Sequence, residues 1–149
     1  LALELGADVA IDSQAQDMTA AIREANGGKR VDVILDMTGG RITDESVNAL
    51  APFGRLGFYG QASREAPKPI APTNLLVHST TIAGMWLPHA FRLPGNVVGQ
   101  AMSELFELAI DDQLRVVAGG EYALADARLA HEALRSRGTT GKLVLNPQL

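Results

Sequence analysis

The feature that most constrains this chain is the aliphatic run VDVILD at residues 31–36, which is followed closely by two glycines. A near-continuous run of Val, Ile and Leu is typical of a parallel strand buried on both faces, because helices cover each side of such a sheet. Gly39 and Gly40 lack a Cβ atom, so another group can approach the backbone closely there. The run predicts a central strand whose carboxyl end is either a ligand site or a tight turn.

Helical and strand patterns alternate through the first sixty residues. A helix is expected over 17–26, because Asp17 is a good N-cap and apolar residues follow at helical spacing. Thr43 is expected to cap the next helix, and strands are expected at 9–11 and 55–60. Such alternation predicts an α/β fold in which parallel strands are joined by crossover helices.

The rest of the chain continues with further helices and strands. Its first part is a Pro-rich connector at 61–72, where three prolines disfavour both helix and central strand. The elements expected after it are a short helical turn that Thr73 caps, a β-prone run at 80–87, a long helix over 94–110, a strand near 115–118, a helix over 126–136 and a last strand over 142–146.

Composition and charge exclude several classes of function. The chain has 149 residues, 46% of them hydrophobic and 20% charged, as in a single globular domain. Its net charge of −4 and its scattered Lys and Arg residues argue against nucleic-acid binding. No apolar run approaches the ~20 residues that span a bilayer, so we expect no membrane partner and a cytoplasmic location. With no cysteine and no ligand spacing among the three histidines, no metal site is predicted.

Four blocks of sequence, in order and in register, resemble the carboxyl half of the medium-chain dehydrogenase/reductase superfamily. They are LGADVAID, VDVILDMTGG, LAPFGRLGFYG and ALADARLAHEALRSRGTTGKLVLNP, and the quinone oxidoreductase branch is the best match. The resemblance implies a partial Rossmann-type doubly wound parallel sheet without its first strands and its glycine-rich phosphate turn. It implies that residues 1–111 are a partial nucleotide-binding domain, and that 112–149 return to the catalytic domain.

The same resemblance implies an oxidoreductase that uses NADP(H), without zinc, to transfer hydride to a quinone, enone or related carbonyl compound. No residue is assigned as a catalytic acid or base. The implied cofactor-binding residues follow three successive strands. Thr38 and Gly39, with Gly40 in the same turn, would lie near the nicotinamide ribose; Tyr59, Gly60 and Gln61 would lie beside the nicotinamide, and Met85 and Trp86 would flank the same ring.

Each of these residues also has a purely structural interpretation. Gly39 and Gly40 could simply form the turn into the next helix. Tyr59 could be a half-buried core aromatic residue, and Trp86 could serve packing or a subunit contact. Asp36 is interpreted as a hydrogen-bonded or solvated carboxylate at the end of its strand. Sequence alone leaves these alternatives open.

The start of the chain and the implied strand order raise a further alternative. The chain begins without Met inside a helical pattern, so upstream residues are expected. In the order 3-2-1-4-5-6 the two central strands are absent, which leaves the strand at 31–36 with an unpaired edge. We expect a second copy, a collapsed third strand or the missing half to fill it. A chain that is stable alone is expected to form a homo-oligomer there or across residues 80–87.

The alternative function is therefore a noncatalytic, truncated Rossmann-like module that self-associates and binds no cofactor. A methyltransferase is disfavoured, because the residues after Asp36 lack the alternating glycines of its cofactor loop.

Overall fold

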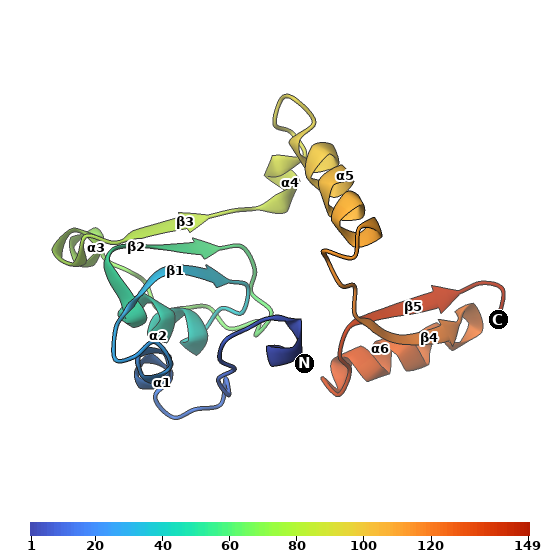
Figure 1. The fold of residues 1–149 in the computed structure, drawn as a ribbon, viewed down its shortest axis with the longest axis horizontal. Helices are drawn as coiled ribbons and strands as arrows, with labels where there is room; N and C mark the ends of the chain where they lie inside the picture. Colours follow the sequence, from blue (N-terminus) through green and yellow to red (C-terminus); the bar gives the residue numbers. More distant parts are fainter. The chain divides into compact units, whose positions relative to one another are not determined.

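The aliphatic run forms strand β1 (Val31–Asp36), with the bounds that its sequence predicts. The strands β2 (Leu50–Phe58) and β3 (Thr81–Gly84) extend the sheet in the order β1-β2-β3, and both pairs are parallel. The computed structural model describes all of residues 1–149. Figure 1 shows the three strands pointing in one direction, so the predicted α/β fold with parallel strands is confirmed.

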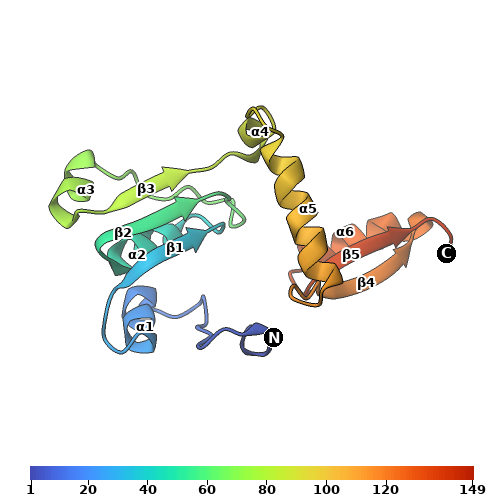
Figure 2. The ribbon, with the colours of Figure 1, turned by 45° about the horizontal axis from the view of Figure 1, so that its top comes forward.

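One face of this sheet carries the core of residues 1–98. Ile34, Leu56 and Ile82 are paired in register on that face, and Leu56 is only 1% exposed. Helix α2 (Arg41–Ala49) packs against β1 and β2, and α1 (Met18–Ala25) packs on α2 (Figures 1 and 2). Burial of the Ile34, Leu56 and Ile82 side chains fixes the strand register, because a slip of one residue would turn these side chains to the opposite face.

The opposite face of β1 is open, which corrects the expectation that both faces are buried. Val33 is 56% exposed and Leu35 is 72% exposed, because no helix of residues 1–98 covers them. As expected, β1 lies at an edge of the sheet. The strand predicted at 9–11 does not form, since a strand needs a hydrogen-bonded neighbour and this segment has none.

The two helices below the sheet begin differently from each other. Asp17 caps α1 as predicted, and its Oδ1 accepts a hydrogen bond from the Ala20 N–H at 2.8 Å. The prediction that Thr43 caps α2 is wrong, because α2 begins at Arg41 and Gly40 is the residue before it. Thr43 lies inside the helix, and its hydroxyl donates to the Asp36 carboxylate instead.

Two further boundaries differ from the sequence prediction. Strand β2 begins at Leu50 rather than Arg55, because its first residues pair irregularly with β1 and Phe53 adopts a φ of +65° before the ladder resumes. Helix α3 (Pro72–His78) begins with Pro72 in its first turn, and Thr73 does not cap it. Proline is well suited to that position, because a first-turn residue has no intrahelical acceptor for its N–H.

Residues 99–149 form a second compact unit. Strands β4 (Ala118–Ala123) and β5 (Lys142–Asn146) pair in parallel, and α6 (Ala127–Arg135) connects them and packs against both. The last strand has its predicted bounds, whereas β4 begins where the predicted strand at 115–118 ends. The predicted domain division at residue 111 concerns the catalytic domain of longer proteins and stays a prediction.

The remaining elements are short, apart from one helix. Helix α5 crosses the division between the two units, which falls between residues 98 and 99. None of the helices combines the length and the apolar character that crossing a bilayer requires. The bounds of these elements are η1 (Leu3–Leu5), α4 (Leu87–Ala90), α5 (Val97–Ile110) and η2 (Leu124–Asp126).

Candidate functional site

The predicted cofactor-binding residues lie at one edge of the sheet. Because β1, β2 and β3 are parallel neighbours, the segments that follow their carboxyl ends lie side by side. The pairing extends past the strands: the Tyr59 N–H donates to the Asp36 carbonyl at 3.0 Å, and the Met85 N–H donates to the Phe58 carbonyl at 2.9 Å. The structure thus brings the three predicted segments together, although their role toward a cofactor stays a prediction.

Asp36 organises the first of these segments. Its side chain is almost fully buried, with 3% of the residue exposed. One carboxylate oxygen accepts hydrogen bonds from the Thr38 N–H at 2.7 Å and, more weakly, from the Gly39 N–H at 3.4 Å. The other accepts from the Thr43 hydroxyl on α2. Asp36 is therefore the hydrogen-bonded strand-end carboxylate expected from the sequence, and it ties the glycine turn to the helix that follows.

The loop after β2, rather than a ligand, makes the close approach that Gly39 and Gly40 permit. Gly39 has a φ of +81° and Gly40 a φ of +57°, a region that favours glycine. A Cβ atom on Gly39 would lie 2.8 Å from the Gln61 Cγ, and one on Gly40 would lie 2.9 Å from the Glu65 Cβ. The loop after β2 thus packs directly on the turn after β1, which is a structural reason for both glycines.

Backbone hydrogen bonds hold the same two segments together. The Ser63 N–H donates to the Thr38 carbonyl at 2.8 Å, and the Ala62 N–H donates to the Met37 carbonyl at 3.0 Å. Gly60 fits closely against the turn, since a Cβ there would lie 2.9 Å from the Met37 carbonyl oxygen. The site therefore has a fixed backbone floor.

Three large side chains that follow β2 and β3 at this edge are exposed. Tyr59 is 42% exposed, Met85 is 51% exposed and Trp86 is 65% exposed. Trp86 is also the residue that precedes α4. These groups offer an aromatic and thioether surface, to which flat, partly apolar ligands bind well. No group of three or more His, Asp or Glu residues is arranged to hold a metal ion.

A second set of contacts beside the turn was missed by the sequence analysis. The Arg41 guanidinium donates to the Ser13 carbonyl at 2.7 Å, to the Ala15 carbonyl at 3.1 Å and to the Glu45 carboxylate at 2.6 Å. We call Arg41 and Glu45 the α2 clamp. Their i,i+4 spacing was a readable signal for a pair on one helix face.

Glu45 extends this clamp to the start of α1. Its Oε2 accepts hydrogen bonds from the Met18 and Thr19 N–H groups, and the Thr19 hydroxyl donates to the Glu45 carbonyl at 3.0 Å. The hydrogen bond from Arg41 lowers the pKa of Glu45, and the two backbone N–H groups act in the same direction. The clamp therefore pins residues 13–19 against the first turns of α2.

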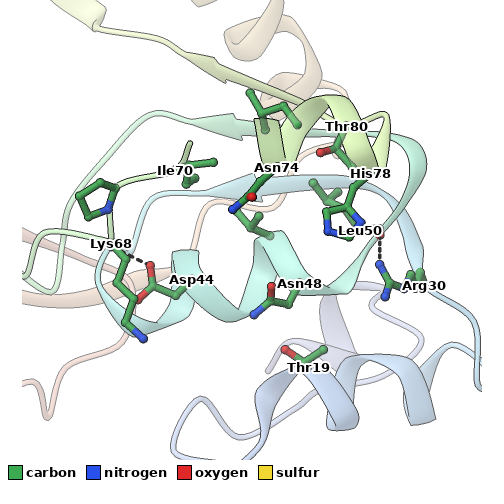
Figure 3. A pocket seen from close by; sticks show the side chains of 13 residues that line it. Thr19, Arg30, Asp44, Asn48, Leu50, Lys68, Ile70, Asn74, His78 and Thr80 are labelled. Atoms are coloured by element: carbon green, nitrogen blue, oxygen red, sulfur yellow. Dashed lines mark hydrogen bonds between the residues drawn. The ribbon is translucent and has the colours of Figure 1, made fainter. Parts of the chain in front are cut away.

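A cavity of about 490 Å³ lies elsewhere in the same unit (Figure 3). Arg30 and Thr80 on its wall directly precede β1 and β3, so the cavity is at the amino ends of the strands. None of the predicted cofactor-binding residues lines it. Ligands of open α/β sheets bind at the carboxyl ends, so we take the carboxyl edge as the candidate site. The lining residues are Thr19, Arg30, Asp44, Val47, Asn48, Leu50, Lys68, Pro69, Ile70, Asn74, Leu75, His78 and Thr80.

The parallel sheet, its helix-covered face and its convergent carboxyl ends define the chain as part of a Rossmann-like α/β protein. Residues 5–145 match the family model described as zinc-binding dehydrogenase. The chain belongs to this family, and the resemblance to the medium-chain dehydrogenase/reductase superfamily is confirmed.

Quinone oxidoreductases and a haloacrylate reductase are among the relatives. The chain is 32% identical to a quinone oxidoreductase of Salmonella typhimurium over 98% of its own length and 45% of the relative. It superposes on the structure of a 2-haloacrylate reductase with a TM-score of 0.83, at 31% identity, over 99% of this chain and 46% of that one.

A further structural neighbour is a mycobacterial protein complexed with NADPH. The two share 33% identity with a TM-score of 0.77, over 95% of this chain and 44% of that one. The chain thus spans less than half the length of these relatives.

Proposed function

We propose that the carboxyl edge of β1-β2-β3 binds the nicotinamide end of NADPH. The chain would do so as part of an oxidoreductase that transfers hydride to a quinone, enone or related carbonyl compound. The observation that carries this proposal is the convergence of the segments after three parallel strands, which gathers Thr38, Tyr59 and Met85 at one edge. The NADPH complex of a mycobacterial neighbour and the reductases among the relatives support it.

The residues at this edge fit a nicotinamide ring and its ribose. Tyr59, Met85 and Trp86 expose apolar surface on which a flat ring can rest and from which water is displaced. The turn at 38–40 offers backbone groups held in place by the buried Asp36. When bound, the cofactor supplies the hydride, and the protein contributes orientation and exclusion of water.

The substrate class is part of the proposal and is taken from the relatives. The relatives include quinone oxidoreductases and a 2-haloacrylate reductase. The compounds in these names, quinones and haloacrylates, each contain an electron-poor double bond or carbonyl group. No side chain at the edge is assigned as an acid or base, so the chain's own role is to hold the cofactor. Zinc independence likewise stays a proposal.

A second candidate function is a noncatalytic module that self-associates. It is favoured by the unpaired edge of β1 and by the exposure of Val33 and Leu35 on the open face. Such an edge is a template for pairing with another chain. Homo-oligomer formation belongs to both candidates and can be measured by sedimentation.

The single tryptophan gives a direct test of the first candidate. Trp86 is the only Trp in the chain, so its emission can be titrated with NADPH, whose reduced ring accepts energy from a nearby indole. We expect saturable quenching with a Kd on the order of micromolar. The fragment 2′-phospho-ADP-ribose lacks the nicotinamide and should cause no such quenching.

The two tyrosines offer a matched pair of variants. Tyr59→Ala should weaken NADPH binding about fivefold, because a buried aromatic contact is worth on the order of 1 kcal/mol. Tyr122→Ala changes a tyrosine in β4, outside the site, and should leave binding unchanged. Absence of saturable quenching up to millimolar NADPH would contradict the proposal and favour the noncatalytic module.

A further inference from the structure

The α2 clamp places a second segment of chain beside the glycine turn. Arg41 directly follows Gly40, and its guanidinium reaches two backbone carbonyls, those of Ser13 and Ala15. These residues are 28 and 26 positions away in the sequence. Residues 13–15 are thus held at the carboxyl end of β1, although they belong to no helix or strand.

The order of the strands along this edge suggests which part of a ligand residues 13–15 would face. The strands follow one another as β3, β2 and β1, and Figure 2 shows the segment before α1 on the β1 side of the sheet. The proposed nicotinamide surface, Tyr59 and Met85, lies over β2 and β3. A dinucleotide that rests its nicotinamide there and crosses the edge runs over β1 toward residues 13–15.

We infer that Arg41 is a positioning residue that holds residues 13–15 as a wall for the part of the dinucleotide remote from the nicotinamide. This inference rests on the proposed function of the edge. Arg41 acts through the two carbonyls that it binds, and it is not assigned a contact with the cofactor. Glu45 orients the guanidinium and fixes the far end of the same segment at Met18 and Thr19.

The chemistry of arginine suits this task. A planar guanidinium presents several N–H donors in fixed directions, so one side chain can bind two carbonyls and a carboxylate at once. Lysine carries the same charge on a compact ammonium group and cannot reproduce this fork. A Lys substitution at residue 41 should therefore restore only part of the effect of arginine.

The test compares a whole cofactor with half of it. NADPH and reduced nicotinamide mononucleotide are each titrated against the wild-type chain and Arg41→Gln, with Trp86 emission as the readout. We expect Arg41→Gln to weaken NADPH binding about tenfold, because residues 13–15 are then no longer held against the cofactor, and to leave the mononucleotide unchanged. Arg41→Lys should fall between wild type and Arg41→Gln. Arg128→Gln on α6 is the matched control and should change neither titration.

Amide exchange supplies a readout that needs no ligand. In Arg41→Gln the Gln14 and Ala15 amides, which bond to Asp12, should lose protection. The amides of β2 should keep theirs, which shows that the fold persists.

The possible outcomes separate this inference from the proposed function. If wild type binds both ligands and Arg41→Gln binds NADPH equally well, the positioning role is wrong and the proposed function stands. An equal loss for NADPH and the mononucleotide also overturns the role, because the damage then reaches the nicotinamide side. If the wild-type chain binds neither ligand, the proposed function fails, and the positioning role of Arg41 fails with it because there is no bound cofactor.

Discussion

Two Arg–Glu pairs of the same spacing have different roles in α2 and α6. Arg41–Glu45 and Arg128–Glu132 are both i,i+4 pairs, and in each the Nη1–Oε1 distance is 2.6 Å. In α6 the pair makes no further side-chain hydrogen bond, and its side chains are 79% and 54% exposed. In α2 the side chains are 44% and 19% exposed and bind the backbone of residues 13–19 as well.

The comparison shows that i,i+4 spacing identifies an Arg–Glu pair but does not tell whether the pair also binds another segment of the chain. An exposed pair within one helix gains little, because water screens it and two long side chains must be ordered. A pair that also satisfies backbone groups of another segment organises that segment. Arg41 and Glu45 of α2 bind the backbone of residues 13–19, whereas Arg128 and Glu132 of α6 bind only each other, and this contrast can be tested.

The largest difference should come from the buried carboxylate that α2 uses. Asp36→Ala removes the acceptor of the Thr43 hydroxyl, which is buried, and of the Thr38 N–H, which is partly buried. We expect a loss of about 3 kcal/mol in the free energy of unfolding, measured by urea titration followed through Trp86. Glu132→Ala removes an exposed acceptor of α6 and should cost about 0.5 kcal/mol or less by circular dichroism.

Asp36→Asn tests the reason for that effect. The amide keeps one acceptor oxygen for the turn, and the Thr43 hydroxyl can accept from the new NH₂ group. Its destabilisation should be less than half that of Asp36→Ala. Equal losses in the two variants would mean that the charge, rather than the hydrogen bonds, stabilises the turn.

The next difference concerns glycines. Gly39→Ala forces a Cβ into a left-handed residue, 2.8 Å from the Gln61 Cγ, and should destabilise the chain by about 2 kcal/mol. Gly138→Ala, after α6, has no positive φ, and the nearest atom to its new Cβ is the Ser136 Oγ at 3.4 Å. Thermal unfolding should show the second variant to be nearly neutral.

The elements that the sequence predicts well depend on local patterns. The bounds of β1 and β5 are those expected, and Asp17 caps α1, because alternation, apolar runs and capping are properties of neighbouring residues. The convergence of the site segments was also predictable, since parallel strands place their carboxyl ends at one edge.

What the sequence does not predict depends on distant partners. Residues 9–11 have a strand-like composition but no neighbouring strand. Thr43 would be a good cap, but the hydroxyl is taken by Asp36. The bonds from Arg41 to residues 13–15 join positions more than two dozen residues apart, which no local pattern reports.

The pH dependence of the α2 clamp is the next contrast. The pKa of Glu45 is lowered, chiefly by its hydrogen bond from Arg41. A lowered pKa in the folded state means that the contribution is complete above the ordinary value of 4.5 and is lost as the pH falls through the lowered value. Acid should therefore release the Met18 and Thr19 amides from the Glu45 carboxylate, whereas the Arg41 bonds to Ser13 and Ala15 do not titrate.

Amide-exchange protection at Met18 and Thr19 measures this release. Protection in the wild type should fall below the transition, and Glu45→Gln should show reduced protection with no acid step. Glu132→Gln should leave the wild-type profile at these two amides intact. An acid step that persists in Glu45→Gln would assign the titration to another group.

The smallest effect is expected for the pair that resembles the clamp only in spacing. A double-mutant cycle with Arg128→Ala and Glu132→Ala should give a coupling energy of about 0.3–0.5 kcal/mol, which falls further when salt is added. Both partners are exposed and bind nothing outside α6, so no second segment loses order when they are removed. A coupling energy above about 1 kcal/mol would be too large for an exposed pair within one helix. The i,i+4 spacing alone would then account for the strength of both pairs, and the contacts with residues 13–19 would not distinguish them.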